Sequence, residues 1–295
     1  MCRLPLKWAA PDDFVLTPDG IIDIRGNIVP LSADMVPEPW GWNKAVKRIF
    51  LNLGVREEQM PTDAELELWR SFASRRWAAE YAEWLYANQD IRRFLVDNHM
   101  HFCLTTDELT SWMAENIGHE YILKSEYSSS GRGNTINRLR PTPVLADRFY
   151  VKTLDFALEF EINKTEVRYL GLSVFQASRQ GRYEFNYHLP QAELQQMVVS
   201  HINPDGATGR MADGATGRMA DGTTGRIDGT PAGAGGLSCL SQLISIHHAL
   251  LSRHLLGRYR GFVGIDMLVT DRHLVHPCIE VNLRMNMGVA VLLAN

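Results

Sequence analysis

The chain has 295 residues, of which 45% are apolar and 22% are charged. This composition is typical of a globular protein and is sufficient for one large domain or two smaller ones. The 30 Lys and Arg residues against 34 Asp and Glu residues give a formal net charge of −4. Because no strong basic field is available for a nucleic-acid backbone or an anionic membrane, we expect neither as a partner.

The sequence also shows no membrane span, no secretory signal and no closely spaced cysteine pair. No apolar stretch approaches the roughly 18 residues that a membrane span requires, and residues 1–13 lack the continuous apolar run of a secretory signal. The cysteines (Cys2, Cys103, Cys239 and Cys278) lie far apart and form no Cys-x-x-Cys pair. We therefore expect a cytoplasmic protein without a disulfide framework or a cysteine-only zinc site.

Residues 1–100 alternate between short strands and helical patterns, which predicts an N-terminal α/β domain. Strands are expected at residues 14–16, 20–25 and 101–104, and helices at residues 42–53, 62–88, 90–96 and 106–116. The longest of these helices begins with Thr62 as its N-cap and Glu65 three residues later, the pattern of a capping box.

From residue 119 onward the pattern is richer in strands and predicts an α+β region. Strands are expected at residues 121–124, 156–162 and 167–176, and the last two are joined by a turn at Asn163 and Lys164. A helix is expected at residues 237–256. Residues 261–269 and 278–283 are expected to form a β-hairpin near the end of the chain.

An octapeptide repeat interrupts this region. Residues 205–212 read DGATGRMA, residues 213–220 repeat it, residues 221–228 read DGTTGRID, and a Gly/Ala tail extends to Gly236. Apart from Met, the unit has no large apolar side chain whose burial could offset the entropy of ordering. We expect a mobile surface insertion over residues 205–236; a substrate-covering lid that uses its arginines is the alternative.

The C-terminal hairpin carries the first group of functional candidates. Because strand side chains alternate between faces, Glu280, Asn282 and Arg284 share one face of the last strand. Asp266 interrupts the preceding apolar strand, and placing it opposite Glu280 centres the hairpin at residue 273. Two facing carboxylates are unfavourable without a compensating charge, and Asp, Glu and Asn oxygens suit Mg²⁺ with nucleotide phosphates. Gly264 leaves room for a group to approach this face. The alternative is a solvated polar face with an Arg284–Glu280 ion pair.

The second group is the segment K-S-E-Y-S-S-S-G-R-G-N, which begins at Lys124. A strand that enters a Ser/Gly loop can direct backbone N–H groups at phosphate oxygens, and Lys124 and Arg132 would add positive charge. The segment is not a Walker A motif, because no Gly-Lys-Ser/Thr follows at the required spacing. Taken alone, the segment is better explained as a plain Ser/Gly turn.

Together and in this order, the two groups resemble the motifs of ATP-grasp enzymes. The resemblance covers about residues 101–295 and rests on K-S-E-Y-S-S-S-G-R-G, L-D-F-A-L-E-F-E-I, G-I-D-M and E-V-N-L-R-M-N-M-G. It implies the fold class α/β and α+β: a pre-grasp-like α/β domain over residues 1–100, then an ATP-grasp domain of two α+β subdomains over residues 101–295. Such enzymes use ATP and Mg²⁺ to activate a carboxylate as an acyl phosphate, which an amine attacks.

The resemblance also implies roles for individual residues. Lys124 and Arg284 would be catalytic, and Asp266, Glu280 and Asn282 would hold Mg²⁺. The remaining ATP contacts would come from the loop, from an adenine-binding hinge, and from one of two candidate ribose-binding acids on a shared strand face. These are Lys124, Ser129, Ser130, Gly131, Arg132 and Gly133 for the loop, Tyr150, Val151 and Lys152 for the hinge, and Glu159 or Glu161 for the ribose.

Two other functions fit the same site. One is a small-molecule kinase, and the other is a catalytically inactive nucleotide-binding module. The leading hypothesis is a carbon–nitrogen ligase whose partners are a small-molecule carboxylate and an amine. The sequence is compatible with a homo-oligomer.

Overall fold

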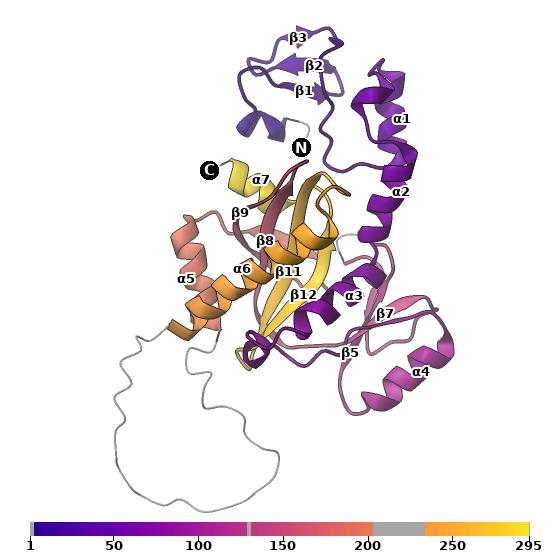
Figure 1. Ribbon diagram of the computed structural model, residues 1–295, viewed down its shortest axis with the longest axis vertical. Coiled ribbons are helices and arrows are strands. Elements are labelled where there is room, and N and C mark those ends of the chain that lie inside the picture. Colours follow the sequence, from indigo (N-terminus) through magenta and orange to yellow (C-terminus); the bar gives the residue numbers. More distant parts are fainter. Residues whose placement is uncertain (1–2, 129–130, 203–233, 295) are drawn as a thin grey trace, which may run out of the picture.

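The computed structural model describes residues 3–128, 131–202 and 234–294. In these ranges the chain forms seven α-helices and three antiparallel sheets (Figure 1). The mixed helix-and-sheet architecture confirms the predicted fold class. The octapeptide repeats and the predicted loop residues Ser129 and Ser130 lie outside the described residues, and the division at residue 100 stays a prediction.

The three sheets differ in size and position. The first contains β1 (Phe14–Thr17), β2 (Gly20–Asp23) and β3 (Ile28–Val29). The second has the order β10 (Tyr183–Asn186), β9 (Val167–Ala177), β8 (Lys152–Ile162), β11 (Gly261–Thr270) and β12 (Val275–Asn282). The third has the order β4 (His101–Cys103), β7 (Val144–Arg148), β5 (Tyr121–Ser125) and β6 (Asn134–Ile136).

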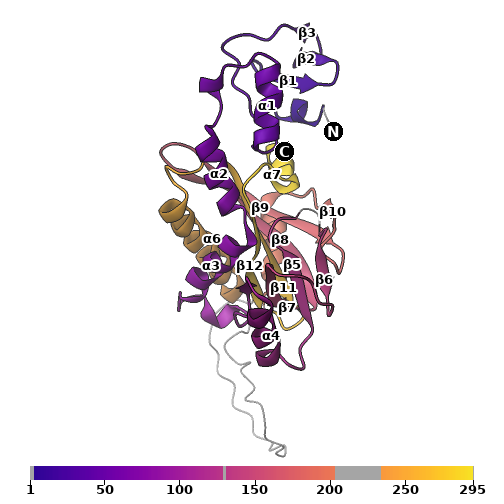
Figure 2. The same cartoon turned by 90° about the vertical axis from the view of Figure 1, so that its right-hand side faces the viewer.

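The helices lie between and around these sheets. They are α1 (Lys44–Asn52), α2 (Asp63–Phe72), α3 (Arg75–Tyr86), α4 (Thr106–Glu115), α5 (Gln191–His201), α6 (Ala234–His254) and α7 (Met287–Leu293). Figure 2 shows β1–β3 and α1 at one end of the molecule and the two larger sheets in its body. No helix in the described ranges has the length and apolarity that crossing a membrane requires.

The five-stranded sheet has an apolar face and a polar face. On the apolar face, Leu158 of β8 lies beside Ile265 of β11 and Leu172 of β9, all fully buried. The helices α3, α5 and α6 contact strands of this sheet, and their apolar residues join the same core cluster (Figure 1). Strand alternation turns the intervening side chains to the opposite face. This polar face carries the acids Asp155, Glu159, Glu161, Asp266 and Glu280.

The four-stranded sheet directs Lys124 toward the five-stranded sheet. Leu123 packs with α4 in a separate small core, so alternation along β5 places Lys124 on the other face. There it pairs in register with Leu145 of β7, which belongs to the main core. The two sheets are further joined by a hydrogen bond between His276 Nε2 and Asp147 Oδ2 of 2.9 Å.

The helix expected over residues 62–88 is divided into α2 and α3, so this prediction was wrong at its centre. Thr62 forms the expected capping box with Glu65, but Ser74 then caps a new helix by accepting a hydrogen bond from the Arg76 backbone N–H. The Ser74 hydroxyl also donates to Glu126 Oε1 at 3.0 Å. The second cap redirects the chain and turns Arg75, which is 3% exposed, into the interior.

Most of the other predicted elements are confirmed, with shifted ends. The exception is the helix expected at residues 90–96, where only a short 3-10 turn forms at Arg92–Phe94. The hairpin forms with Asp266 opposite Glu280, as expected, and its turn places His273 at a φ of +61°. Four strands, β3, β6, β7 and β10, and two α-helices, α5 and α7, were not predicted.

Candidate active site

The site is centred on the carboxylates of Asp266 and Glu280, which face each other across β11 and β12. Asn282 Nδ2 donates to Asp266 Oδ2 at 3.0 Å, and Arg284 Nη2 donates to Asn282 Oδ1 at 2.9 Å. Although Asp266 keeps some accessible surface, burial raises its pKa well above the usual range, and the charges of Glu280 and Glu159 raise it further. The hydrogen bond from Asn282 and the charge of Arg284 favour the ionised form of Asp266 but do not offset this burial.

These residues form a donor set that fits Mg²⁺. No group of three or more His, Cys, Asp or Glu side chains suited to a metal occurs in the described ranges. Magnesium, however, is often held by one or two carboxylates with phosphate oxygens and water in the other positions. Asp266 and Glu280 supply the carboxylates. The Asn282 carbonyl oxygen accepts from Arg284 and its amide nitrogen faces Asp266, so Asn282 would bind a metal only after its side chain turned away from Arg284.

Lys124 lies near this carboxylate pair. Its side chain is buried, and no hydrogen bond or ion pair engages its Nζ within the described parts of the chain. Burial lowers the pKa of Lys124, while the negative charges of Asp147 and Glu280 act in the opposite direction. An unpaired buried ammonium is costly, so this position favours an anionic ligand.

Arg75 is a second cation at the site, and the sequence analysis did not identify it. Its guanidinium lies 3.1 Å from Glu280 Oε2 and donates to the Ser125 carbonyl and the Ser128 Oγ, both at 2.7 Å. One side chain therefore links β12 to the start of the Ser/Gly loop. The signal in the sequence was Ser74, a good N-cap inside an otherwise continuous helical pattern.

The described end of the loop requires its glycines. Gly131 and Gly133 have φ values of +69° and +80°, in the region that favours glycine. A Cβ atom at Gly133 would lie 2.7 Å from Ser125 Oγ, and one at Gly131 would lie 2.9 Å from the Gln180 carbonyl oxygen. Arg132 between them is exposed. The loop thus returns over the turn between β9 and β10, beside the polar face.

The predicted hinge lies at the junction of the two larger sheets. The Tyr150 ring packs edge-on against His276 at 5.6 Å, and the Val151 carbonyl accepts a hydrogen bond from Asp271 N–H at 3.0 Å. Lys152 Nζ pairs with Asp155 and donates to the Ala177 carbonyl at 2.7 Å. Asp155 therefore lies next to the hinge, on the polar face.

The two acids predicted to contact ribose are not favourably placed for it. Glu159 is 1% exposed, and its oxygens accept hydrogen bonds from Asn286 Nδ2 and Ser173 Oγ, both at 2.8 Å. Glu161 is paired with Arg168. At about 3.3 Å per residue, Glu159 and Glu161 lie about 7 and 13 Å farther from the hinge along β8 than Ala157, which pairs with Asp266.

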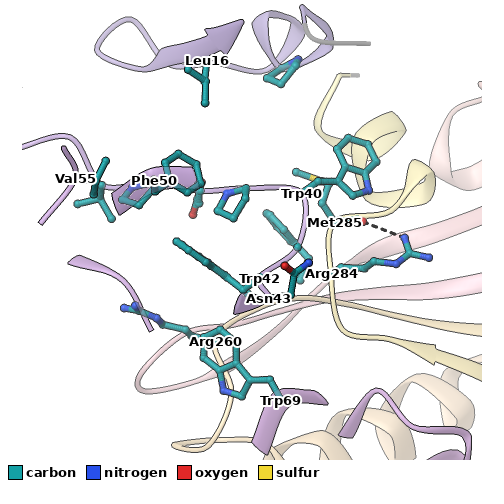
Figure 3. A pocket seen from close by; sticks show the side chains of 18 of the residues that line it. Leu16, Trp40, Trp42, Asn43, Phe50, Val55, Trp69, Arg260, Arg284 and Met285 are labelled. Atoms are coloured by element: carbon teal, nitrogen blue, oxygen red, sulfur yellow. Dashed lines mark hydrogen bonds between the residues drawn. The ribbon is translucent and has the colours of Figure 1, made fainter. Parts of the chain in front are cut away.

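A cavity of about 1450 Å³ lies beside Arg284. It is bounded by β1, by α1 and α2, by the segment that precedes α1, and by the ends of β8 and β12 (Figure 3). Figure 3 shows Trp40 and Trp42 close to Arg284 and Met285, with Leu16 of β1 on the other side. The Met285 N–H donates to the Trp40 carbonyl at 2.8 Å. The cavity and the carboxylate pair thus share the segment around Arg284.

Comparison with known proteins found similarity at the level of structure. No protein-family model and no curated protein matches the sequence. Similar solved structures include the biotin carboxylase domain of Hydrogenobacter thermophilus 2-oxoglutarate carboxylase with MgADP and bicarbonate (TM-score 0.47, 12% identity, 85% of this chain and 50% of that chain). Another is N5-carboxyaminoimidazole synthetase from Staphylococcus aureus with ADP (0.46, 10%, 82% and 58%). A third is D-alanyl-alanine synthetase A from Vibrio cholerae (0.40, 12%, 94% and 78%).

These three proteins are ATP-grasp enzymes, the family whose motifs the sequence resembles. The chain spans 50% and 58% of the length of the first two. At these TM-scores and identities the similarity assigns no activity to this chain. The function proposed below therefore rests on the chain's own side chains.

Proposed function

We propose that this protein is an ATP- and Mg²⁺-dependent ligase that activates a carboxylate as an acyl phosphate for attack by an amine. The observation that carries the proposal is the pairing of Asp266 and Glu280 across β11 and β12, with Arg75 bonded to Glu280 and Lys124 beside it. Two facing carboxylates flanked by two buried cations suit a metal-bound polyphosphate better than they suit a structural role.

The positions along β8 give the nucleotide a direction. The hinge, Tyr150–Lys152, would hold the adenine, and the ribose-binding acid would be Glu159, Glu161 or Asp155, which lies nearest to the hinge and is paired with Lys152. Asp155 lies about 10 Å from Lys152 along the strand, and Ala157, which pairs with Asp266, lies about 17 Å from Lys152. Base, ribose and phosphates would then follow one another along the polar face toward Asp266.

The chemistry requires positioning and charge rather than a side-chain nucleophile. A carboxylate oxygen of the substrate attacks the γ-phosphorus, and the bond to the β-phosphate oxygen breaks, with its electron pair leaving on ADP. The amine then attacks the acyl carbon, phosphate leaves with the C–O electron pair, and the amine nitrogen loses its proton to solvent. Bound Mg²⁺ would neutralise phosphate charge and polarise the γ-phosphoryl group. Lys124, Arg75 and Arg284 would stabilise the same charge.

The test is the carboxylate dependence of ADP release. Purified protein is incubated with ATP, Mg²⁺ and a panel of carboxylic acids, with hydroxylamine present to convert any acyl phosphate into a stable hydroxamate. The proposal predicts ADP, phosphate and hydroxamate in equal amounts, and only when a carboxylate is added. A phosphorylated alcohol without hydroxamate would indicate a kinase instead. Saturable ATP binding without any ADP would indicate a nucleotide-binding module.

A further inference from the structure

The cavity beside Arg284 has an unusually apolar and aromatic lining. Four of the seven tryptophans of the chain line it, and so do six of the exposed large apolar side chains. These six are Phe14, Leu16, Val36, Trp40, Leu53 and Tyr127. Exposed apolar residues that gather in one concave site indicate a ligand with an apolar body. The flat indole and phenyl faces favour an aromatic or other planar group.

Arg284 supplies a cationic anchor where this cavity approaches the carboxylate pair. Its guanidinium has five N–H donors, and two are committed, to Asn282 Oδ1 at 2.9 Å and to the Met285 carbonyl at 3.2 Å. The remaining donors suit a carboxylate, for which a guanidinium fork is the preferred partner. Because Arg284 also contacts Asn282, an acid bound here would have its oxygen next to the phosphate site.

The charges of the lining are unevenly distributed: the N-terminal segment contributes acids, whereas the cations Lys44, Arg70, Lys164, Arg260 and Arg284 come from other elements. Asp12, Asp13, Asp34 and Glu38 line the cavity from the N-terminal segment. Desolvation and the like charges of Glu161 and Asp13 raise the pKa of Glu38, as expected where negative charges are close together. A second negative charge placed against this acidic segment would meet repulsion, which a monocarboxylate held by Arg284 avoids.

We propose that this cavity binds a monocarboxylic acid with a flat apolar body and presents its carboxylate, held by Arg284, to the γ-phosphate. The inference rests on the proposed ligase function and specifies its substrate. The carboxylate oxygen forms the new bond to phosphorus and ADP leaves with the broken bond's electron pair, so the acid needs no proton transfer at this step. The apolar body stays between β1 and the Trp40–Trp42 segment.

Three matched probes separate the contributions of body and charge. Phenylacetate has both features, phenylethanol has the body without the carboxylate, and succinate has a carboxylate with a second charge in place of the body. Intrinsic tryptophan fluorescence reports binding without ATP, and hydroxamate formation with ATP, Mg²⁺ and hydroxylamine reports activation. We expect phenylacetate to bind and react at least about tenfold better than succinate, and phenylethanol to bind weakly and form no product.

Variants of the apolar wall provide the second arm. Leu16→Glu introduces a charge at a cavity residue that is 40% exposed, and Ile24→Glu is its matched control, 41% exposed and outside the cavity lining. Leu16→Glu should raise the KM for phenylacetate about tenfold or more with kcat nearly unchanged, whereas Ile24→Glu should leave both within about twofold. Val36→Glu, at an exposed lining residue, repeats the test if Leu16→Glu fails to fold.

The outcomes distinguish the substrate inference from the function beneath it. Hydroxamate from succinate at a rate equal to or above that from phenylacetate, or equal effects of Leu16→Glu and Ile24→Glu, would overturn the apolar substrate while leaving the ligase intact. Phenylacetate binding that Leu16→Glu weakens, with no ADP from any acid, would support the cavity assignment and reject the ligase. Absence of both binding and turnover with the aromatic acid would overturn the inference.

Discussion

Two neighbouring positions on the polar face of the five-stranded sheet hold their carboxylates differently. At one position, Glu159 accepts hydrogen bonds from Asn286 and Ser173 and is covered by α7, where a Cβ atom at Gly288 would lie 2.0 Å from Glu159 Oε1. At the next position along the sheet, Asp266 and Glu280 face each other, and within the described residues only Glu280 is ion-paired, to Arg75. Neutral donors enclose the first carboxylate, whereas the facing pair holds two carboxylates against one bonded cation, which favours additional positive charge.

The largest effect is expected from removing one carboxylate of the facing pair, Asp266 and Glu280. Glu280→Gln should reduce Mg²⁺-dependent turnover about 10²–10³-fold, because the loss of one anionic ligand weakens the metal that stabilises the transferred phosphoryl group. Steady-state kinetics at varied Mg²⁺ concentration measures the effect. Glu184→Gln, an exposed glutamate in β10 of the same sheet, is the control and should remain active. Normal turnover in Glu280→Gln would remove the metal assignment.

Glu159, the carboxylate enclosed by α7, should instead affect the pH dependence of the free energy of unfolding. Burial raises the pKa of Glu159 to about 7 from 4.5, so the unfolded chain loses this proton before the folded chain does. The stability that this group contributes is therefore present below pH 4.5 and is lost as the pH rises through 7. Glu159→Gln, which cannot ionise, should gain about 2–3 kcal/mol relative to wild type between pH 5 and pH 8.

Urea unfolding at the two pH values checks this prediction. Glu161→Gln is the matched control, because Glu161 lies two residues along the same strand and pairs with Arg168 at a partly exposed position. Surface pairs of this kind contribute about 0–1 kcal/mol, so the control should change little at either pH. A Glu159→Gln variant whose stability runs parallel to wild type across the range would show that the carboxylate is not held in its neutral form.

Arg75 is the cation that is ion-paired with the facing carboxylates, through Glu280. Arg75→Lys keeps the charge but loses the fork that joins Glu280, Ser125 and Ser128, so affinity for ATP with Mg²⁺ should fall about tenfold. Titration calorimetry measures this directly. Arg76→Lys alters the neighbouring residue, which is exposed and pairs with Glu80, and should bind ATP normally. Equal affinities in the two variants would place Arg75 outside the phosphate site.

The hairpin and its carboxylates were predictable because they follow from local rules. Strand alternation, the polar turn and the isolated Asp266 in an apolar strand together determine the register with Glu280, and the structure has that register. Lys124 was found because a strand followed by a Ser/Gly loop is a local pattern. Such features depend on residues that are close in sequence or paired in one hairpin.

The remainder depends on tertiary contacts that one-dimensional patterns do not encode. Glu159 and Glu161 share a strand face, as expected. Only the position of α7 shows that Asn286 donates a hydrogen bond to Glu159. Asp155 is an exception, because it lies only three residues after Lys152 on β8 and its pairing with Lys152 is local. Arg75 was hidden inside an apparently continuous helix, since its role depends on Glu126, Ser125 and Ser128, about 50 residues away in the chain.

The break between α2 and α3 is itself testable, with the smallest expected effect. The Ser74 hydroxyl accepts from Arg76 N–H at 3.0 Å and donates to Glu126 Oε1 at 3.0 Å, so it both caps α3 and ties it to the strand that leads into the loop. Ser74→Ala should lower the free energy of unfolding by about 1 kcal/mol and should also weaken ATP binding, because Arg75 follows the cap directly.

Ser71→Ala removes an exposed hydroxyl that bonds only within α2 and should stay within about 0.5 kcal/mol of wild type. If Ser74→Ala loses stability but binds ATP normally, the cap holds the helix without positioning Arg75, and the link between the N-terminal helices and the phosphate site would have to come from the Arg75–Glu280 pair alone.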